Sequence, residues 1–350
     1  MPTIADVAAH AGVGLGTVSR VLNGSPKVSD GTRARVLDAI EILGYRPNPL
    51  ARGLSLGRCQ TVGVVVPFFT HASAVERLRG VVAVPDESRY DLVLFNVESP
   101  VHRDEHLGAL TRRDRADGLL VMSLPVPARD LERLTRAGVP VVLVDASADG
   151  VPTVSTDDFD GGRMATQHLV DLGHRSIGFL GDDPDNPFGF TSSTWREAGY
   201  RAVLDDAKID WQPELVRHGP HDRTVAQGLA AELLSLPEPP TAIFASSDVQ
   251  ATGVLAAAAD SGRRVPDDVS VIGFDDIELS AYVGLTTVRQ PLFDSGYLGG
   301  RLLLEALAQP PTEPVDATAH RLALELVERR TTAPPPRPRQ RARAERAHRG

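Results

Sequence analysis

Residues 3–24 read TIADVAAHAGVGLGTVSRVLNG. Thr3 followed by Asp6 is a capping pattern that begins a helix, and apolar residues then recur at helical spacing. A Gly-Val-Gly turn at 12–14 precedes a second predicted helix at about 15–22. The side chains expected to face inward are those of Ile4, Val7, Ala8, Ala11, Val18, Val21 and Leu22.

A third helix is predicted from Ser29 or Asp30 to the residue before Gly44. Two helices joined by a short Gly-containing turn, with a third packed behind them, form a helix-turn-helix. The second helix of that motif lies in the major groove of DNA. The apolar face expected for the third helix consists of Val36, Leu37, Ile40 and Leu43.

The distribution of charge supports a DNA-binding head on a body that does not bind DNA. The whole chain has a net charge of −9, but residues 1–58 carry seven Lys/Arg and four Asp/Glu. Residues 331–350 carry six Arg and one Glu, so residues 59–330 are strongly acidic. Phosphates would repel this body and attract the head.

From residue 61 onward, short β-branched runs alternate with amphipathic stretches, which is typical of parallel sheets covered by helices. The runs form two series that begin alike, with TVGVVVP at 61–67 and SIGFLGD at 176–182. Two similar α/β lobes are therefore predicted, with a ligand cleft beyond the carboxyl ends of their strands. The predicted strands are 61–66, 91–95, 118–121, 140–144, 176–180, 215–216, 242–245 and 269–274. The predicted helices are 102–115, 158–172, 192–207, 222–235 and 247–262.

Residues 50–55 are interpreted either as a short helix or as a plain linker, because an isolated helix this short is marginal in water. The Pro- and Arg-rich tail from Thr331 is predicted to be disordered, with arginines that are either solvated or attracted to DNA.

A single cysteine, Cys59, argues against intramolecular disulfides and multi-Cys metal sites. No apolar run approaches the ~18 residues of a membrane span, and a cytoplasmic location is expected. We find no metal-ligand spacing and no catalytic triad, so no metal, cofactor or catalytic residue is predicted.

The motifs resemble the lactose-repressor (LacI/GalR) family of bacterial transcription factors. The likeness rests on TIADVA at 3–8, GTVSRVLNG at 16–24 and LGYRPN at 43–48, and it continues in order to about residue 330. Further matching stretches are His168-Leu169, Leu172-Gly173-His174-Arg175, Ser247-Asp248, Gly273-Phe274-Asp275-Asp276 and Leu285-Thr286-Thr287-Val288-Arg289-Gln290.

The resemblance implies a homodimer with an all-α helix-turn-helix head and an α/β effector domain of two Rossmann-like lobes, similar to periplasmic sugar-binding proteins. The implied division is a DNA-binding domain at 1–46, a hinge helix and linker at 47–60, two lobes at 61–330 and the tail at 331–350. The N-lobe would comprise about 61–157 and 290–320, and the C-lobe about 158–288 and 321–330. The three crossings between the lobes would lie near 156–160, 288–290 and 318–323, and the last N-lobe helix at 292–307.

The resemblance also places Leu15, Gly16 and Arg20 toward the major groove, where Arg20 would pair with a guanine or hold a phosphate. Gly16 stands where the family often has larger polar residues, so direct readout at that base is expected to be weak. Leu54 aligns with a leucine that wedges into the minor groove, and core packing is the alternative. The other implied DNA contacts are Thr3, Thr17, Ser19, Asn23, Lys27 and Asn48.

In the cleft, the family positions that hold the ligand match Asp145, Arg196, Asp248 and Asp275. Carboxylates accept hydrogen bonds from adjacent hydroxyls and arginine donates to oxygens, which suits a sugar. Two alternatives stay open: Asp248 caps a helix that begins near Val249, and the 182–191 loop only covers the cleft edge. Further candidates for the cleft wall or for stacking on a sugar are Phe68, Thr70, Phe188, Phe190 and Trp195.

The sequence therefore predicts a DNA-binding transcriptional regulator, a repressor, whose operator affinity is controlled by a mono- or disaccharide. A solute-binding protein is one rival: a bare one should have an export signal, and one that stays in the cytoplasm should still lack a basic head. A DNA-targeted α/β enzyme is another, and it would need a catalytic constellation. The tail lacks heptad leucines, which favours a dimer over a tetramer. The effector, its sign of action and the operator sequence stay open.

Overall fold

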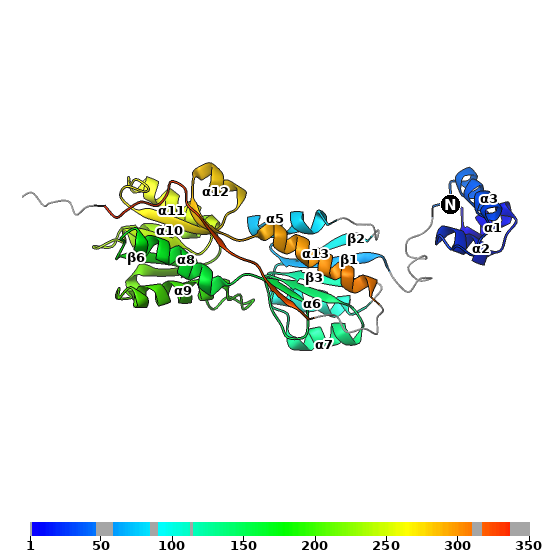
Figure 1. Ribbon diagram of the computed structural model, residues 1–350, viewed down its shortest axis with the longest axis horizontal. Helices are drawn as coiled ribbons and strands as arrows, with labels where there is room; N and C mark the ends of the chain where they lie inside the picture. Colours follow the sequence, from blue (N-terminus) through cyan, green and yellow to red (C-terminus); the bar gives the residue numbers. More distant parts are fainter. Residues whose placement is uncertain (1, 47–58, 85–89, 113–114, 310–316, 337–350) are drawn as a thin grey trace, which may run out of the picture.

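The computed structural model describes residues 2–46, 59–84, 90–112, 115–309 and 317–336 (Figure 1). The head contains α1 (Ile4–Ala11), α2 (Leu15–Leu22) and α3 (Asp30–Leu43). Thr3 and Asp6 form the expected capping box, because the Thr3 hydroxyl accepts from the Asp6 amide and the Asp6 carboxylate accepts from the Thr3 amide. Gly12 and Gly44 end their helices with φ of +64° and +58°, values that glycine adopts without steric cost.

The three helices of the head share one small core, with Val7, Val18 and Val36 fully buried. The expected inward face of α3 is wrong at Leu37, which is 51% exposed. Ala39 is buried in its place. The reason is geometric: positions 36, 39, 40 and 43 follow the helical repeat, whereas position 37 lies about 100° away from position 36.

Two sheets follow, as the alternating pattern predicted, but each has six strands where the pattern predicted four, because 153–155, 286–289, 319–321 and 325–327 were not predicted as strands. The N-lobe sheet has the order β11-β5-β4-β3-β1-β2, and every pairing in it is parallel. The C-lobe sheet has the order β12-β10-β9-β8-β6-β7, with only β12 antiparallel. The N-lobe strands are β1 (Thr61–Pro67), β2 (Asp91–Val97), β3 (Gly118–Met122), β4 (Val141–Val144), β5 (Thr153–Ser155) and β11 (Ala319–Arg321). The C-lobe strands are β6 (Ile177–Asp182), β7 (Val216–Gly219), β8 (Ala242–Ala245), β9 (Ser270–Asp275), β10 (Thr286–Arg289) and β12 (Glu325–Val327).

Helices cover both faces of each sheet because alternate strand residues point to opposite sides. In β1, Val64 and Val66 pack beneath α5 (Ala72–Val82) and α13 (Leu292–Ala308). Val65 packs on the other face, beneath α6 (Pro100–Leu110) and α7 (Ala128–Arg136). In the C-lobe, α8 (Asp158–Asp171) and α9 (Ser192–Asp206) cover one face, and α10 (Arg223–Leu234) and α11 (Asp248–Asp260) the other. The short helices η1 (Pro213–Leu215) and α12 (Glu278–Val283) complete this lobe.

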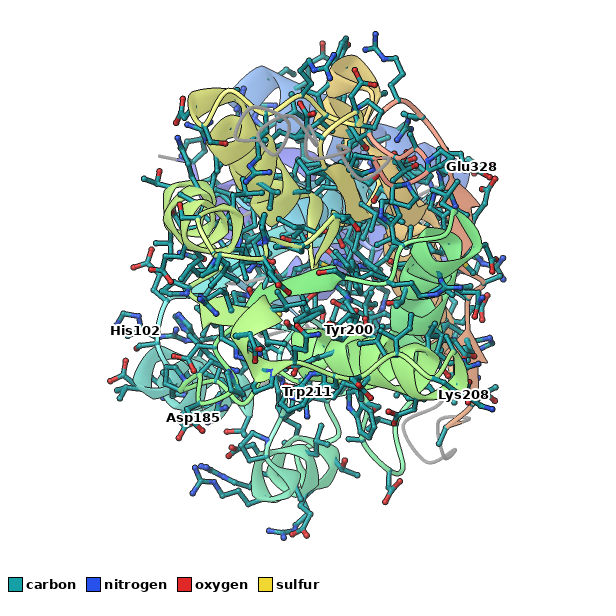
Figure 2. The ribbon with its side chains drawn as sticks, turned by 90° about the vertical axis from the view of Figure 1, so that its left-hand side faces the viewer. His102, Asp185, Tyr200, Lys208, Trp211 and Glu328 are labelled. Atoms are coloured by element: carbon teal, nitrogen blue, oxygen red, sulfur yellow. The ribbon has the colours of Figure 1, made fainter. Side chains whose placement is uncertain are left out.

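The fully buried Tyr200 of α9 donates its hydroxyl to the Ile177 carbonyl oxygen at 2.8 Å, which ties the helix to the start of β6. Figure 2 looks at the C-lobe end of the molecule and shows Tyr200 among the elements of this lobe, with Asp185 and Lys208 toward opposite edges.

The chain passes between the lobes three times, from β5 to α8, from β10 to α13 and from β11 to β12. All four strands involved lie at the same edge of their sheets. The crossings are bonded to one another: the Leu322 amide donates to the Ser155 carbonyl at 2.8 Å, and Arg289 pairs with Glu325 at 2.8 Å. This edge is therefore the hinge side of the molecule.

The expected disorder from Thr331 onward is wrong for residues 331–336, which lie against the C-lobe. The buried Thr331 hydroxyl donates to the Val271 carbonyl at 2.7 Å. His174 Nε2 donates to the Ala333 carbonyl at 2.8 Å, and burial lowers the pKa of this ring, so the neutral form is favoured. Hydrogen bonds from a threonine hydroxyl and an imidazole thus hold a segment that has no apolar periodicity. Residues 337–350 lie outside the described residues.

Candidate functional site

A cavity of about 920 Å³ lies between the lobes, at the carboxyl ends of the strands. Phe68, Ser123 and Asp145 follow β1, β3 and β4 of the N-lobe, and Asp182 and Asp275 end β6 and β9 of the C-lobe. This is the edge at which parallel α/β sheets bind ligands. Of the residues expected in the cleft, those that line the cavity are Phe68, Asp145, Phe190, Trp195, Arg196 and Asp275.

Arg196 lies on α9, is 7% exposed and stacks over the Phe274 ring at 3.7 Å. Its Nε donates to Asp158 Oδ1 at 2.8 Å, Nη2 pairs with the same oxygen at 2.8 Å, and Nη1 donates to the Ser246 carbonyl at 2.6 Å. A guanidinium has five N–H groups, so three are used within the protein and one on each terminal nitrogen stays available to a ligand.

Two cleft carboxylates, one from each lobe, are joined through the hinge. Asp145 accepts from the Ser123 hydroxyl at 2.7 Å and pairs with Arg77 at 3.0 Å. Arg77 also donates to Gln290 Oε1 at 3.2 Å, and Gln290 Nε2 donates to Asp275 Oδ1 at 2.6 Å. Asp145 and Asp275 have φ of +57° and +120°, which is uncommon for residues other than glycine and clusters at functional sites. Burial raises the pKa of Asp275, although the charge of Arg196 opposes this.

Asp248 does not line the cavity, contrary to expectation, and it does not cap α11 either. It is fully buried and accepts from the Ile277 amide at 3.1 Å, the Thr287 hydroxyl at 2.6 Å and the Ser280 hydroxyl. Ser247 is the capping residue, and its hydroxyl accepts from the Gln250 amide. Asp248 therefore joins α11 to α12 and β10 beneath the cleft, and burial raises its pKa.

Phe188 and Thr70 also lie off the cavity wall. Phe188 belongs to the loop after β6 of the C-lobe but is buried in the N-lobe core, edge-on to Phe68 with ring centroids 5.5 Å apart. Thr70 lies exposed in the turn that follows β1. Phe188 therefore has a structural role, which was the alternative to stacking on a sugar. Phe190 and Trp195, which is 55% exposed, do line the cavity.

Several cavity residues were not among the sequence candidates, notably Arg77, His71, His221, Asp182 and Gln290. Asp182, His71 and His221 could have been found, because each closely follows a strand that the sequence predicted and so lies near its carboxyl end. Gln290 closes the last matching motif. Arg77 had no such signal, since it lies within a helix that we did not predict.

In the head, α2 turns Val18 and Val21 into the core and leaves the opposite face open. Leu15 is 53% exposed, Gly16 has no atom within 4 Å of its open side, and Arg20 is exposed. Of the other expected DNA contacts, Thr3, Asn23 and Lys27 are exposed and Thr17 and Ser19 half-buried, whereas Asn48 and Leu54 lie outside the described residues.

Within the described ranges, no helix is long and apolar enough to cross a membrane. Across the same ranges, no group of three or more His, Cys, Asp or Glu side chains is arranged to hold a metal ion.

Comparison with known families gives two matches. Residues 3–48 match bacterial regulatory proteins of the lacI family, and residues 166–332 match a periplasmic binding protein-like domain. Catabolite control protein A of Priestia megaterium is 35% identical over 94% of this chain and 99% of its own length. The HTH-type transcriptional regulator CelR of Thermobifida fusca is 38% identical over 90% of this chain and 94% of its own length.

Solved structures agree with these matches. A lac repressor dimer bound to operator and the anti-inducer ONPF has a TM-score of 0.80 at 29% identity, covering 95% of this chain and 99% of that one. A complex of the transcriptional regulator CelR with cellobiose has a TM-score of 0.68 at 34% identity, covering 95% and 100%. A regulator from Enterococcus faecium with bound ribose has a TM-score of 0.69 at 29% identity, covering 78% and 99%.

Proposed function

The chain belongs to the lacI family of bacterial regulatory proteins, and on this premise we propose that it is a sugar-responsive transcriptional repressor. It is a DNA-binding regulator whose operator affinity is controlled by a small ligand. The observation that carries the proposal is the cavity between the lobes, with Asp145 and Asp275 facing it from opposite sides. A ligand that bridges the two lobes changes their relative position, and by linkage it changes operator affinity to the same extent that DNA changes ligand affinity.

Carbohydrate is supported by the chemistry of the cavity wall. Carboxylates that accept from hydroxyls, the free N–H groups of Arg196 and the aromatic faces of Phe190 and Trp195 together suit a polyol with one apolar face. Relatives of the chain have been solved with cellobiose and with ribose. We therefore propose that Asp145, Arg196, Asp275, Phe68, Phe190 and Trp195 contact the effector.

We propose a homodimer as the working form, as in the lac repressor dimer on its operator. Large apolar side chains stay exposed on the described chain at Val82 of α5, Tyr282 of α12 and Phe293 of α13, with exposures of 71%, 74% and 42%. Covering such side chains favours association of two copies.

A cytoplasmic location and the absence of catalysis are part of the proposal, since the relatives named above are transcriptional regulators.

The effector class is tested by thermal shift of the purified protein with mono- and disaccharides, ribose and cellobiose included, and with nucleobases and amino acids as controls. A specific ligand at a hundred-fold excess over its Kd stabilises the protein by roughly 2.7 kcal/mol, which is readily measured. We expect a hit among the sugars. If no sugar shifts the melting temperature, or if only a control compound does, the effector is not a carbohydrate, and the proposal of a DNA-binding regulator is unaffected.

Leu54→Ala is expected to weaken operator affinity by about tenfold or more, because paired leucines would no longer wedge into the minor groove and kink the duplex. Fluorescence anisotropy with a labelled operator fragment measures the affinity, and thermal shift checks that effector binding is unchanged. Leu37→Ala is the matched control, since Leu37 is an exposed leucine on α3. Equal operator affinities for the wild type and Leu54→Ala would refute the wedge.

A further inference from the structure

Four aromatic rings, two from each lobe, meet across the cleft. His71 of the N-lobe stacks on His221 of the C-lobe, with ring centroids 5.3 Å apart and planes 26° apart. His71 also stacks on Phe68 of its own lobe, with centroids 5.2 Å apart and planes 20° apart. Phe68 in turn meets the edge of Phe188, which comes from the C-lobe. Phe68 and His71 of the N-lobe thus lie between two rings of the C-lobe, with Phe188 against Phe68 and His221 against His71.

These rings lie away from the hinge. The three crossings use strands at the β11-β5 and β12-β10 edges of the sheets. His71 follows β1, which is next to the opposite edge of its sheet, and His221 follows β7, which forms the opposite edge of the other. A rotation about the crossings separates the far edges most, so the contact between His71 and His221 exists only while the lobes are closed.

His221 is fixed within its own lobe. Its Nδ1 lies 3.2 Å from Asp182 Oδ1, and the same oxygen accepts from Gln250 Nε2 at 2.9 Å. Burial alone lowers the pKa of His221, but the hydrogen bond to Asp182 raises it above its ordinary value. The other charged groups that act on His221 are Asp275, Arg196 and Asp222, all in the C-lobe. Opening of the cleft therefore leaves these partners of His221 in place.

His71 differs, because the charged groups that act on it belong to the other lobe. Burial lowers the pKa of His71, and the charge of His221 lowers it further against an opposing effect of Asp182. Because the two shifts are opposite, His71 loses its proton before His221 as the pH rises in the closed cleft, and a neutral ring stacked on a protonated one is an attractive arrangement. When the lobes open, His71 loses the contact with His221 and the charge that lowers its pKa, while it keeps the stack on Phe68 of its own lobe.

We propose that the stack of His71 on His221 is an interlobe latch, which holds the effector cleft closed while His71 is neutral and releases it when His71 is protonated. The direction of the pH dependence follows from the linkage between closure of the cleft and protonation of His71. Because closure lowers the pKa of His71, closure is favoured above the ordinary histidine pKa of about 6.5 and lost as the pH falls below it. Each unit by which closure lowers the pKa reduces the ratio of closed to open protein by about tenfold on full protonation.

The latch regulates the cleft of the proposed function, but its test uses neither effector nor operator, so its failure would leave that function untouched. Nitroxide labels are placed at Val101→Cys and Thr224→Cys in a Cys59→Ser background. Both label sites are exposed in the described structure and begin the helices that follow the edge strands β2 and β7. Pulsed electron paramagnetic resonance then measures the distance between the labels at pH 8 and pH 5.5. An excess of unlabelled chain keeps one labelled protomer in each dimer, and circular dichroism confirms that the protein is folded at both pH values.

At pH 8 we expect a short distance to dominate, and at pH 5.5 a longer one to gain population. His71→Phe keeps a stacking ring without a titratable group, so it should hold the short distance at both pH values, whereas His71→Ala should open at both. His106→Phe is the matched control, because His106 packs on Phe95 within the N-lobe, and acid should open it as it opens the wild type. Equal distance distributions for the wild type at the two pH values, or acid opening of His71→Phe, would overturn the latch.

Discussion

Arg196→Ala is expected to destabilise the C-lobe by about 3 kcal/mol and to abolish the stabilisation by sugar. Removing one partner of a buried ion pair costs roughly 3–5 kcal/mol, and the low end applies because Asp158 is 16% exposed. The change also leaves the Ser246 carbonyl without its donor and uncovers the Phe274 ring. Thermal unfolding measures the first effect, and the shift caused by the best sugar of the panel measures the second.

Arg201→Ala provides the matched control on the same helix. Arg201 pairs with Glu197 rather than with a cleft residue, and its side chain is 47% exposed. We expect a small loss of stability and an undiminished sugar shift for this variant. A sugar shift that survives in Arg196→Ala would show that Arg196 supports the fold without contacting the effector.

Local patterns sufficed for the two-lobe architecture, although α5, α7 and α12 were not predicted. In the head, the residues that begin and end the helices are recognisable in the sequence. Thr3 and Asp6 form the capping box that their spacing predicts, and Gly12 and Gly44 end their helices. The two β-branched series predicted two lobes, since strands buried on both faces read as continuous apolar runs. The short strands at the hinge edge were missed: β5, β11 and β12 have three residues each and β10 has four, and they are held by pairing rather than by their own pattern.

The cleft was harder to predict because its geometry depends on contacts between distant parts of the chain. Asp248 was chosen because it matches a ligand-holding position of the resembled family, but its carboxylate accepts hydrogen bonds from Ser280 and Thr287 instead of facing the cavity. Arg77 and Gln290 are 213 positions apart and meet only when β10 and α5 come together at the hinge. The contact between His71 and His221 likewise arises from two lobes, and no local pattern encodes it.

Gly296→Ala is expected to lower the stability of the N-lobe by about 2 kcal/mol or more, or about 4–8 °C in Tm. The helices α5 and α13 pack at the closeness that glycine allows. A Cβ at Gly296 would overlap the carbonyl oxygen of Arg77, and one at Gly80 would overlap that of Phe293. Because the obstructing atoms are backbone, the two helices must separate to accommodate the methyl group.

Gly228→Ala is the control, because Gly228 lies within α10 with no atom within 4 Å of its open side. There the methyl group meets no obstacle and reduces backbone freedom in the unfolded chain, so a gain of about 0.5–1 kcal/mol is expected. The separation caused by Gly296→Ala acts on α5 at Arg77 itself, and would draw that guanidinium from Asp145 and Gln290. Sugar affinity should therefore fall together with stability in Gly296→Ala and stay unchanged in Gly228→Ala. A Gly296→Ala protein as stable as the wild type would show that α5 and α13 have more room than this packing allows.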